Sequence, residues 1–278
     1  MSALRVALIQ LRTPASQEAA LAQAEPLIRQ AAASGAEFIA TPEGTNILQR
    51  DRAQLLPRLR TADEDPCVQG LARLAAEFGV WLLIGSALVA DADGQAVNRS
   101  LLVDPEGRIV AIYDKLHMFD VDLPTGDTIR ESATYRPGTR AVVHDLPMAR
   151  LGLTICYDMR FAYLYRALAK AGAQILTVPS AFTRPTGQAH WEILLRARAI
   201  ETGSFVLAPA QGGRHEDGRG TWGHSIIVAP WGEILAQAEG DEPGVIMVTL
   251  DLDAVDKARQ AIPALNNERA FTGPDVTP

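Results

Sequence analysis

Three stretches of the chain place a side chain that can do acid-base or nucleophilic chemistry directly after an apolar, strand-like run. Cys156 follows the β-branched and aliphatic run at residues 150–155, and Glu43 and Lys115 each follow a similar run upstream. Active sites of open α/β sheets form along the carboxyl edges of the strands. A lone cysteine in an apolar run is most often a small core residue, so it is the combination of the three that predicts catalysis.

A thiol must lose its proton before it attacks, and the other two residue types supply what that step requires. A carboxylate can accept the proton, and an ammonium stabilises the thiolate. We therefore expect Glu43 to act as general base toward Cys156 and then as general acid toward a leaving amine, with a pKa raised by burial. Lys115 and the backbone amide of Tyr157 would stabilise the oxyanion, and such a donor is typically worth about 3 kcal/mol. The Asp158 carboxylate is expected to support the geometry of the loop.

The histidines leave a second class of enzyme open. A Cys-His thiol protease would use His117 or His190 as its base. We favour Glu43 and Lys115, because each follows the end of a predicted strand. His190 and His224 are expected to serve packing and hydrogen bonding.

The composition argues against several classes of function. The 278 residues carry a formal net charge of -7 and a pI near 5.3, which gives no general attraction to nucleic acid or to an anionic membrane. Cys67 and Cys156 occupy unlike settings, and no Cys/His spacing typical of a metal site occurs, so neither a disulfide framework nor a bound metal is expected. Residues 1–11 read as a strand and not as a signal peptide, which predicts a cytoplasmic protein.

Alternating extended and helical patterns must position these side chains. Turn residues at 93–94 and 105–107 make the middle strands antiparallel, so an α/β fold with a mixed sheet is predicted. The expected strands cover residues 5–11, 37–41, 81–89, 96–104, 108–114, 150–155, 174–180, 205–210, 224–229, 233–236 and 245–251, and the expected helices cover 17–34, 65–78, 163–171, 190–201 and 252–261.

The remaining segments are expected to be loops or a tail. Residues 121–137 form a long irregular segment, which inside a compact domain is more often functional than idle, and residues 182–188 form a shorter loop. No break in composition marks a linker. We expect one domain over residues 1–278, with residues from about 252 as a C-terminal arm.

The three motifs together resemble a known enzyme family. TPEGTN around Glu43, YDKLHMFD around Lys115 and LTICYDMRF around Cys156 resemble the nitrilase superfamily of carbon-nitrogen hydrolases, whose Glu-Lys-Cys triad occurs in this order. The resemblance implies a four-layer α-β-β-α sandwich built from two mixed β-sheets. It also implies a thioester intermediate that water hydrolyses and no metal or organic cofactor. The same resemblance implies a homodimer in which the helix after Cys156 contacts the same helix of the second subunit. A second glutamate found in many members corresponds here to Glu131.

Later segments narrow the substrate that the resemblance implies. The segment PSAFTRPTGQAHWE and the string QGGRH look most like the Nit1 branch, whose members hydrolyse the side-chain amide of deaminated glutathione. A sister branch, an ω-amidase acting on α-ketoglutaramate, is similar through YDMRF and AHWE but lacks that string. An N-carbamoyl amino acid hydrolase is a further alternative within the superfamily.

A small amide that also bears a carboxylate fits the nearby side chains. Arg160, Arg214 and His215 could pair with substrate carboxylates. Arg160 could equally form a structural ion pair with a nearby acid. Phe182 and Thr183 are expected to form walls of the pocket.

Overall fold

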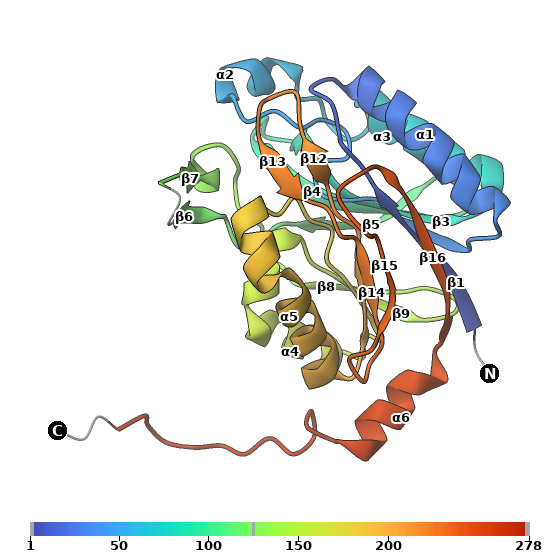
Figure 1. Ribbon diagram of the computed structural model, residues 1–278, viewed down its shortest axis with the longest axis vertical. Coiled ribbons are helices and arrows are strands. Elements are labelled where there is room, and N and C mark those ends of the chain that lie inside the picture. Colours follow the sequence, from blue (N-terminus) through green and yellow to red (C-terminus); the bar gives the residue numbers. More distant parts are fainter. Residues whose placement is uncertain (1–2, 124–125, 276–278) are drawn as a thin grey trace.

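Strand β3 (Trp81–Ala90) is buried at every position between its two ends, on both of its faces. A strand of this kind needs cover on both sides. The computed structural model, which describes residues 3–123 and 126–275, supplies that cover with two stacked sheets and helices outside each (Figure 1). The predicted four-layer α-β-β-α sandwich with two mixed sheets is confirmed.

Each large sheet has six strands and mixes parallel with antiparallel neighbours. In the first sheet the order is β16 (Gly244–Asp251), β1 (Ala3–Gln10), β2 (Phe38–Ala40), β3, β4 (Ala96–Val103) and β5 (Ile109–Asp114). In the second the order is β15 (Ile234–Gln237), β14 (Ile226–Val228), β11 (Phe205–Ala208), β10 (Ile175–Thr177), β9 (Arg150–Leu153) and β8 (Val142–Asp145). The central strands of each sheet run parallel, so their carboxyl ends point the same way within that sheet.

Two pairs of helices cover the outer faces of the sheets. Helices α1 (Gln17–Ala33) and α3 (Pro66–Phe78) pack together outside the first sheet, and α4 (Ala162–Lys170) and α5 (Arg184–Thr202) pack together outside the second (Figure 1). Local sequence sets where α3 begins and ends. The Asp65 side chain accepts hydrogen bonds from first-turn amides, and Gly79 ends the helix in the left-handed conformation with φ of 62°.

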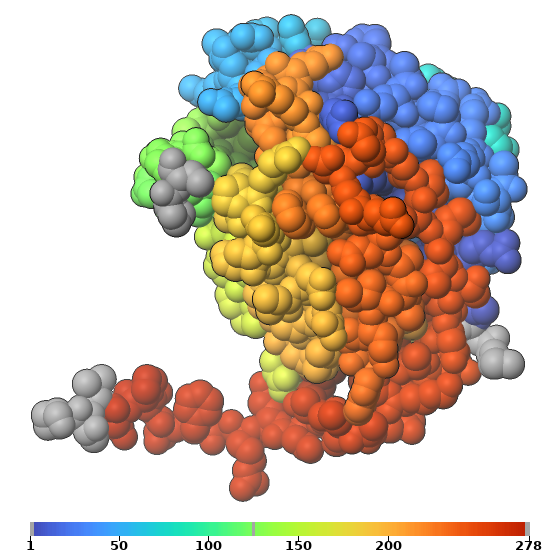
Figure 2. Space-filling model, in the orientation of Figure 1, coloured from blue at the N-terminus to red at the C-terminus, as the bar shows by residue number. Residues whose placement is uncertain are grey.

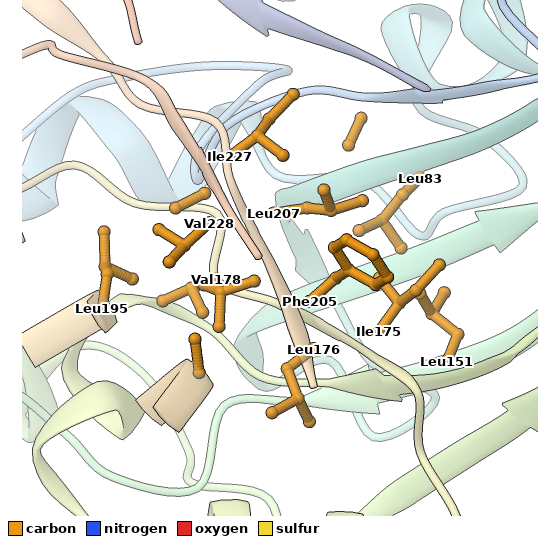
Figure 3. Packing of buried hydrophobic residues seen from close by; sticks show 14 of the residues in the cluster. Leu83, Leu151, Ile175, Leu176, Val178, Leu195, Phe205, Leu207, Ile227 and Val228 are labelled. Carbon is orange, nitrogen blue, oxygen red and sulfur yellow. The ribbon is translucent and has the colours of Figure 1, made fainter. Parts of the chain in front are cut away.

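The apolar core forms two layers. The first lies between the two sheets, where Leu83 of one sheet packs among Leu151, Ile175 and Phe205 of the other (Figure 3). The second lies between the first sheet and helices α1 and α3. The first layer brings the loops that leave both sheets close to one another, which matters for the site described below.

Several short elements differ from the sequence prediction. The predicted loop 182–188 is wrong from residue 184 onward, because Pro185 fits the first turn of α5 and the helix begins there. Strand β8 was not predicted, since its partner β9 specifies it through pairing of Val142 with Leu153. The hairpin of β12 (Gly212–Arg214) and β13 (Gly220–Trp222) was not predicted either, because its short strands contain glycine and show no alternating apolar pattern.

The long segment predicted to be irregular, 121–137, contains regular structure. Strands β6 (Asp120–Asp122) and β7 (Thr128–Arg130) form a hairpin, and a 3-10 turn (Glu131–Ala133) follows it. Residues 124–125 of the predicted segment lie outside the described residues. Upstream, the short helix α2 (Arg52–Leu55) was not predicted either, because it spans one turn only.

The chain ends in a segment that leaves the body of the molecule. Helix α6 (Asp253–Ala261) follows β16, and residues 263–275 then extend away from the sandwich (Figure 1). Phe271 in this extension is 84% exposed. Arg166 and Lys170 of α4 form ion pairs with Glu268, which ties the base of the extension to the body.

Across residues 3–123 and 126–275, none of the helices combines the length and the apolar character that crossing a bilayer requires.

The close approach of the two sheets near β3 generates the first prediction. A Cβ atom at Gly85 would lie 1.8 Å from the Thr41 carbonyl oxygen and 2.4 Å from the Pro179 side chain of the other sheet's loop. Gly85→Ala should therefore lower the free energy of unfolding by about 3 kcal/mol through overpacking. Urea denaturation followed by fluorescence measures this change.

Gly244→Ala is the matched control, because a Cβ atom there meets nothing within 4 Å. It should change the free energy of unfolding by no more than about 0.5 kcal/mol. Equal effects of the two substitutions would contradict the close contact between the sheets at Gly85.

Candidate active site

Glu43 is held by a tight turn after β2. The hydroxyl of Ser86 in β3 accepts a hydrogen bond from the Gly44 amide at 2.9 Å, and the Ser86 carbonyl accepts one from the Thr45 amide at 2.8 Å. The carbonyl oxygen of Glu43 itself accepts a hydrogen bond from the Gln211 side chain at 3.0 Å. The carboxylate is therefore carried on a backbone that is fixed from both sheets.

Lys115 follows β5 directly and is 2% exposed. Its backbone amide donates to the Asn98 carbonyl of the neighbouring strand β4 at 2.9 Å, and its own carbonyl accepts from Gly138 at 2.8 Å. A buried ammonium needs charged or polar partners, and the structure supplies two carboxylates, described below.

Cys156 lies where the chain turns from β9 into a 3-10 helix (Cys156–Arg160), and it adopts a φ of 50°. A left-handed backbone at a residue with a side chain is strained and occurs most often at functional positions. The Cys156 amide donates to the Pro179 carbonyl at 2.9 Å. The buried carboxylate of Asp158 accepts from the Ile155 amide at 2.9 Å and from the Tyr113 hydroxyl at 2.6 Å, so it holds the turn in place.

The side chains from these three turns meet. Lys115 Nζ lies 2.9 Å from Glu43 Oε1 and 2.9 Å from each carboxylate oxygen of Glu131. The Cys156 thiol donates a hydrogen bond to the Glu43 carboxylate. The backbone amide of Ala181, from the loop after β10, donates to Glu43 Oε2 at 2.8 Å.

Asn98 completes this cluster, and the sequence analysis did not select it. Its side-chain amide donates to Glu43 Oε1 at 2.8 Å and to Glu131 Oε1 at 3.3 Å. An asparagine inside the predicted strand 96–104 is the signal that could have identified it, because asparagine is uncommon in strands and a buried amide needs partners.

The expected rise in the pKa of Glu43 is wrong. Burial by itself would raise this pKa, but the charge and hydrogen bond of Lys115, with further hydrogen bonds from Cys156 and Asn98, lower it. The pKa of Lys115 moves upward: burial would lower it, and the charges of Glu131 and Glu43 outweigh that effect. Both groups are therefore ionised at neutral pH.

The Cys156 thiol is neutral in the resting site. Burial raises its pKa and the negative charge of Glu43 raises it further, while Lys115 acts in the opposite direction. The arrangement is a thiol hydrogen-bonded to an ionised base and not a preformed thiolate. Such a pair can transfer its proton when an electrophile reaches the sulfur.

A cavity of about 620 Å³ opens onto Cys156, Glu43, Lys115 and Glu131. Among the residues predicted from the sequence, Tyr157, Phe182 and Thr183 line it. Further out, the walls come from the loop before α2, the β6–β7 hairpin, the residues that follow it and the start of β13. In Figure 2 the α2 segment (light blue), the β6–β7 hairpin (green) and the β12–β13 hairpin (orange) border this part of the molecule.

Arg160, Arg214 and His215 do not line the cavity, which does not match their predicted contact with a substrate carboxylate. The Arg160 guanidinium lies behind the walls, 5.9 Å from the ring centre of Tyr157 and 5.7 Å from that of Phe182. Arg214 is exposed outside the cavity.

His215, the residue that follows β12, is buried. Its ring nitrogens lie 3.2 Å from the Thr13 carbonyl and 2.7 Å from the Thr221 hydroxyl. Burial lowers the pKa of His215 to about 4, so the ring is neutral at pH 7 and brings no charge to a carboxylate.

The two histidines of the alternative Cys-His protease also lie outside the cavity lining. The His117 ring stacks on Phe161 and lies 2.6 Å from Asp158, and His190 lies 3.1 Å from Arg160. His224 stacks on Trp222. The described residues include no group of three or more His, Cys, Asp or Glu placed to hold a metal ion.

Comparison with known proteins supports the same class of chemistry. Residues 5–260 match the family model described as carbon-nitrogen hydrolase. The deaminated glutathione amidase of Yersinia enterocolitica is 40% identical over 272 residues, covering 97% of this chain and 94% of that protein. The human omega-amidase NIT2 is 37% identical over 270 residues, covering 97% and 96%.

Solved structures agree with the fold. The Caenorhabditis elegans NitFhit protein superposes with a TM-score of 0.90 at 34% identity, covering 97% of this chain and 66% of that one. Saccharomyces cerevisiae Nit3 superposes with a TM-score of 0.87 at 30% identity, covering 97% of each chain.

The charges around Cys156 predict how its titration responds to substitution. Glu43 raises the pKa of the thiol and Lys115 lowers it, so Glu43→Gln should allow the thiolate to form at lower pH than in the wild type. The rate of iodoacetamide labelling of each cysteine can be measured by mass spectrometry as a function of pH. The pH at which the labelling rate of Cys156 rises should be lower in Glu43→Gln than in the wild type.

Cys67 is the internal control for this titration. It is fully buried, and burial with the charge of Asp65 raises its pKa, so its labelling should stay slow and be the same in both proteins. An inflection for Cys156 that stays in place or moves up would contradict the assignment of these charges.

Proposed function

The chain belongs to the carbon-nitrogen hydrolase family, and on that premise we propose that it is an amidase in which Cys156 is the nucleophile. The observation that carries the proposal is the buried contact of Lys115 with Glu43 and Glu131 beside the Cys156 thiol, at the inner end of a cavity. This set contains a nucleophile, a base in hydrogen-bond contact with it and a fixed cation, which are the groups that acyl transfer from an amide needs.

The proposed reaction begins when the Cys156 sulfur attacks the amide carbonyl carbon. Glu43 accepts the thiol proton as the S–C bond forms, and Lys115 with the Tyr157 backbone amide stabilises the oxyanion. Glu43 then passes the proton to the amide nitrogen, the C–N bond breaks, and ammonia leaves a thioester on the sulfur.

Water completes the cycle. Glu43 accepts a proton from the water that attacks the thioester, and the C–S bond breaks to give a carboxylic acid and the free thiol. Glu131 is proposed to keep Lys115 charged and aimed throughout, since both of its carboxylate oxygens lie 2.9 Å from the ammonium nitrogen. Ala181, which donates to Glu43 at 2.8 Å, is proposed to hold the carboxylate while it exchanges protons.

Deaminated glutathione is the proposed substrate, with α-ketoglutaramate or an N-carbamoyl amino acid as alternatives. Support comes from the deaminated glutathione amidase at 40% identity over nearly the whole chain, beside a human omega-amidase at 37%. Both names describe enzymes that act on amides, and deaminated glutathione is an amide that also carries carboxylates. The cavity of about 620 Å³ is of ordinary size for a small-molecule site.

We also propose that two copies pair through the face formed by α4, α5 and the C-terminal segment. Large apolar side chains are exposed there, including Tyr163 at 66%, Ile200 at 55% and Ile262 at 58%. A cluster of this kind marks an association surface. A cytoplasmic location is proposed with it, because a nucleophilic thiol functions only while reduced and neither cysteine forms a disulfide.

The first prediction here concerns turnover. Lys115→Ala should lower kcat for amide hydrolysis by at least about 100-fold, because it removes a preorganised oxyanion donor and leaves two buried carboxylates unpaired. Ammonia release from deaminated glutathione and from α-ketoglutaramate, each compared as kcat/KM, measures both the activity and the substrate preference.

His190→Gln is the matched control for the Cys-His alternative and should keep turnover within about twofold, because His190 contacts Arg160 and not the reacting groups. Full turnover by Lys115→Ala, or its loss in His190→Gln, would contradict the proposed triad. Equal kcat/KM for the two amides would leave the class of reaction intact and remove the preference.

A second prediction concerns assembly. Light scattering of the purified protein should give twice the mass of one chain, 29.9 kDa. Ile200→Asp places a charge in the exposed apolar cluster and should shift the protein toward the monomer. Arg73→Asp, a change to an acidic side chain on the exposed side of α3, should leave the mass unchanged. A wild-type monomer would rule out the pairing.

A further inference from the structure

The outer part of the cavity carries an excess of positive charge. Besides Glu43, Lys115 and Glu131, its lining includes one acidic residue, Asp127, and four arginines: Arg50, Arg130, Arg184 and Arg219. The whole chain has a formal charge of -7, so this concentration of cations is opposite in sign to the rest of the protein. A concave surface lined by one sign of charge attracts a ligand of the other sign.

Three of the four arginines form ion pairs with carboxylates, and in two of them, Arg130 and Arg184, the pair uses a terminal guanidinium nitrogen. Arg130 pairs with Asp122 at 2.8 Å and also donates to two backbone carbonyls of its hairpin, and Arg184 pairs with Asp241. These pairs leave little charge for a ligand. Arg130 and Arg184 therefore line the edge of the cavity without offering a free charge that could select a substrate.

Arg50 and Arg219 differ from the other two. Arg50 forms no ion pair with any carboxylate in the described part of the chain, and its side chain is exposed at the mouth of the cavity. Arg219 uses its Nε to donate to Asp217 at 2.6 Å. The described residues give no partner to its two terminal nitrogens, so the fork of the guanidinium stays open.

One buried carboxylate joins the backbone of Arg50 to the side chain of Arg219. Asp217 Oδ2 accepts a hydrogen bond from the Arg50 backbone amide at 2.8 Å and from Arg219 Nε at 2.6 Å, and the Asp217 side chain is 1% exposed. The loop before α2 and the tip of the β12–β13 hairpin are joined at this point. The two arginines therefore leave adjoining points of the cavity wall, with the Arg50 side chain itself exposed.

Tyr135 connects this pair to the reacting groups. It lines the same cavity, and its backbone amide donates to the Glu131 carbonyl at 3.0 Å. Its phenol lies within the electrostatic influence of Glu131 on one side and Arg219 on the other: burial and Glu131 raise the pKa of Tyr135, and Arg219 opposes them. Lys115, Glu131, Tyr135, Arg219 and Arg50 all line this one cavity.

We propose that Arg50 and Arg219 bind the carboxylate at the end of the substrate farthest from the amide that is cleaved. The substrate class is then a chain with the amide at one end and a carboxylate at the other, lying along the cavity wall that includes Tyr135. The guanidinium group suits a carboxylate because it offers parallel N–H donors. This inference rests on the proposed amidase function and assigns the specificity of the same site.

The test compares a charged with a neutral amide. Arg50→Gln should raise KM for α-ketoglutaramate about tenfold, the size expected for losing one hydrogen bond to a charged group, with kcat changed less than twofold. Its kcat/KM for butyramide, which has no carboxylate, should stay the same. Arg219→Lys keeps a charge beside Asp217 but loses the fork, and it should raise the same KM by a smaller factor.

Arg52→Gln is the matched control. It removes the same charge two residues further along, on a side chain that is exposed and does not line the cavity, and it should leave both amides unaffected. An Arg50→Gln variant that loses activity equally on both amides, or not at all, would overturn the inference.

A binding experiment separates failure of this inference from failure of the proposed function. Glutarate titrated calorimetrically into the wild type and into Arg50→Gln reports on the carboxylate site without any turnover. Binding that weakens about tenfold in Arg50→Gln and is unchanged in Arg52→Gln supports the carboxylate site even where no amide is hydrolysed. Equal binding to all three proteins, or no binding to any, overturns it.

Discussion

The contact of one buried ammonium with two buried carboxylates is the constraint on which the rest of this structure depends. Lys115 is 2% exposed and lies between Glu43 and Glu131, and ions removed from water in this way must be fully paired and hydrogen-bonded. The remaining capacity of the carboxylates is satisfied by Asn98 from one sheet, by Ala181 from the other and by the Phe119 amide at 2.6 Å. The site therefore exists only when both sheets are docked, and the same packing that stabilises the sandwich assembles the reacting groups.

This pairing also decides where the proton resides. The lowered pKa of Glu43 and the raised pKa of Cys156 keep the proton on sulfur while the site is empty. In the proposed reaction, transfer becomes favourable only when negative charge moves from sulfur to a substrate oxygen near Lys115, so the substrate itself would activate the Cys156 thiol. A neutral thiol is also less readily oxidised than a thiolate, which protects the group between turnovers.

Much of the fold and of the reacting set could be predicted from the sequence, because both depend on local patterns. The strand ends at Glu43, Lys115 and Cys156 are visible as apolar runs that stop at a charged or polar side chain, and the helix ends follow from residues such as Asp65 and Gly79. The outer cavity could not be predicted in the same way. Arg50 and Arg219 are far apart in the chain and are joined through Asp217. The direction in which the pKa of Glu43 moves depends on its distance from Lys115, which a sequence pattern does not specify. Arg214 and His215 were selected for their residue types, and in the structure Arg214 lies outside the cavity while His215 is buried against Thr13 and Thr221.

The hydrogen bond from Gln211 to the Glu43 carbonyl has a consequence for how such an enzyme can diverge. Gln211 is fully buried and also contacts Thr13, so it connects the stem of the β12–β13 hairpin to the turn that carries Glu43. Replacements in the stem would displace the general base together with the cavity wall. Residues 216–219 at the tip lack this connection, and altered substrate preference can evolve there while the chemistry stays intact. The hairpin thus has a root that is coupled to Glu43 and a tip that is not, and a library of variants aimed at new amides is best placed at the tip.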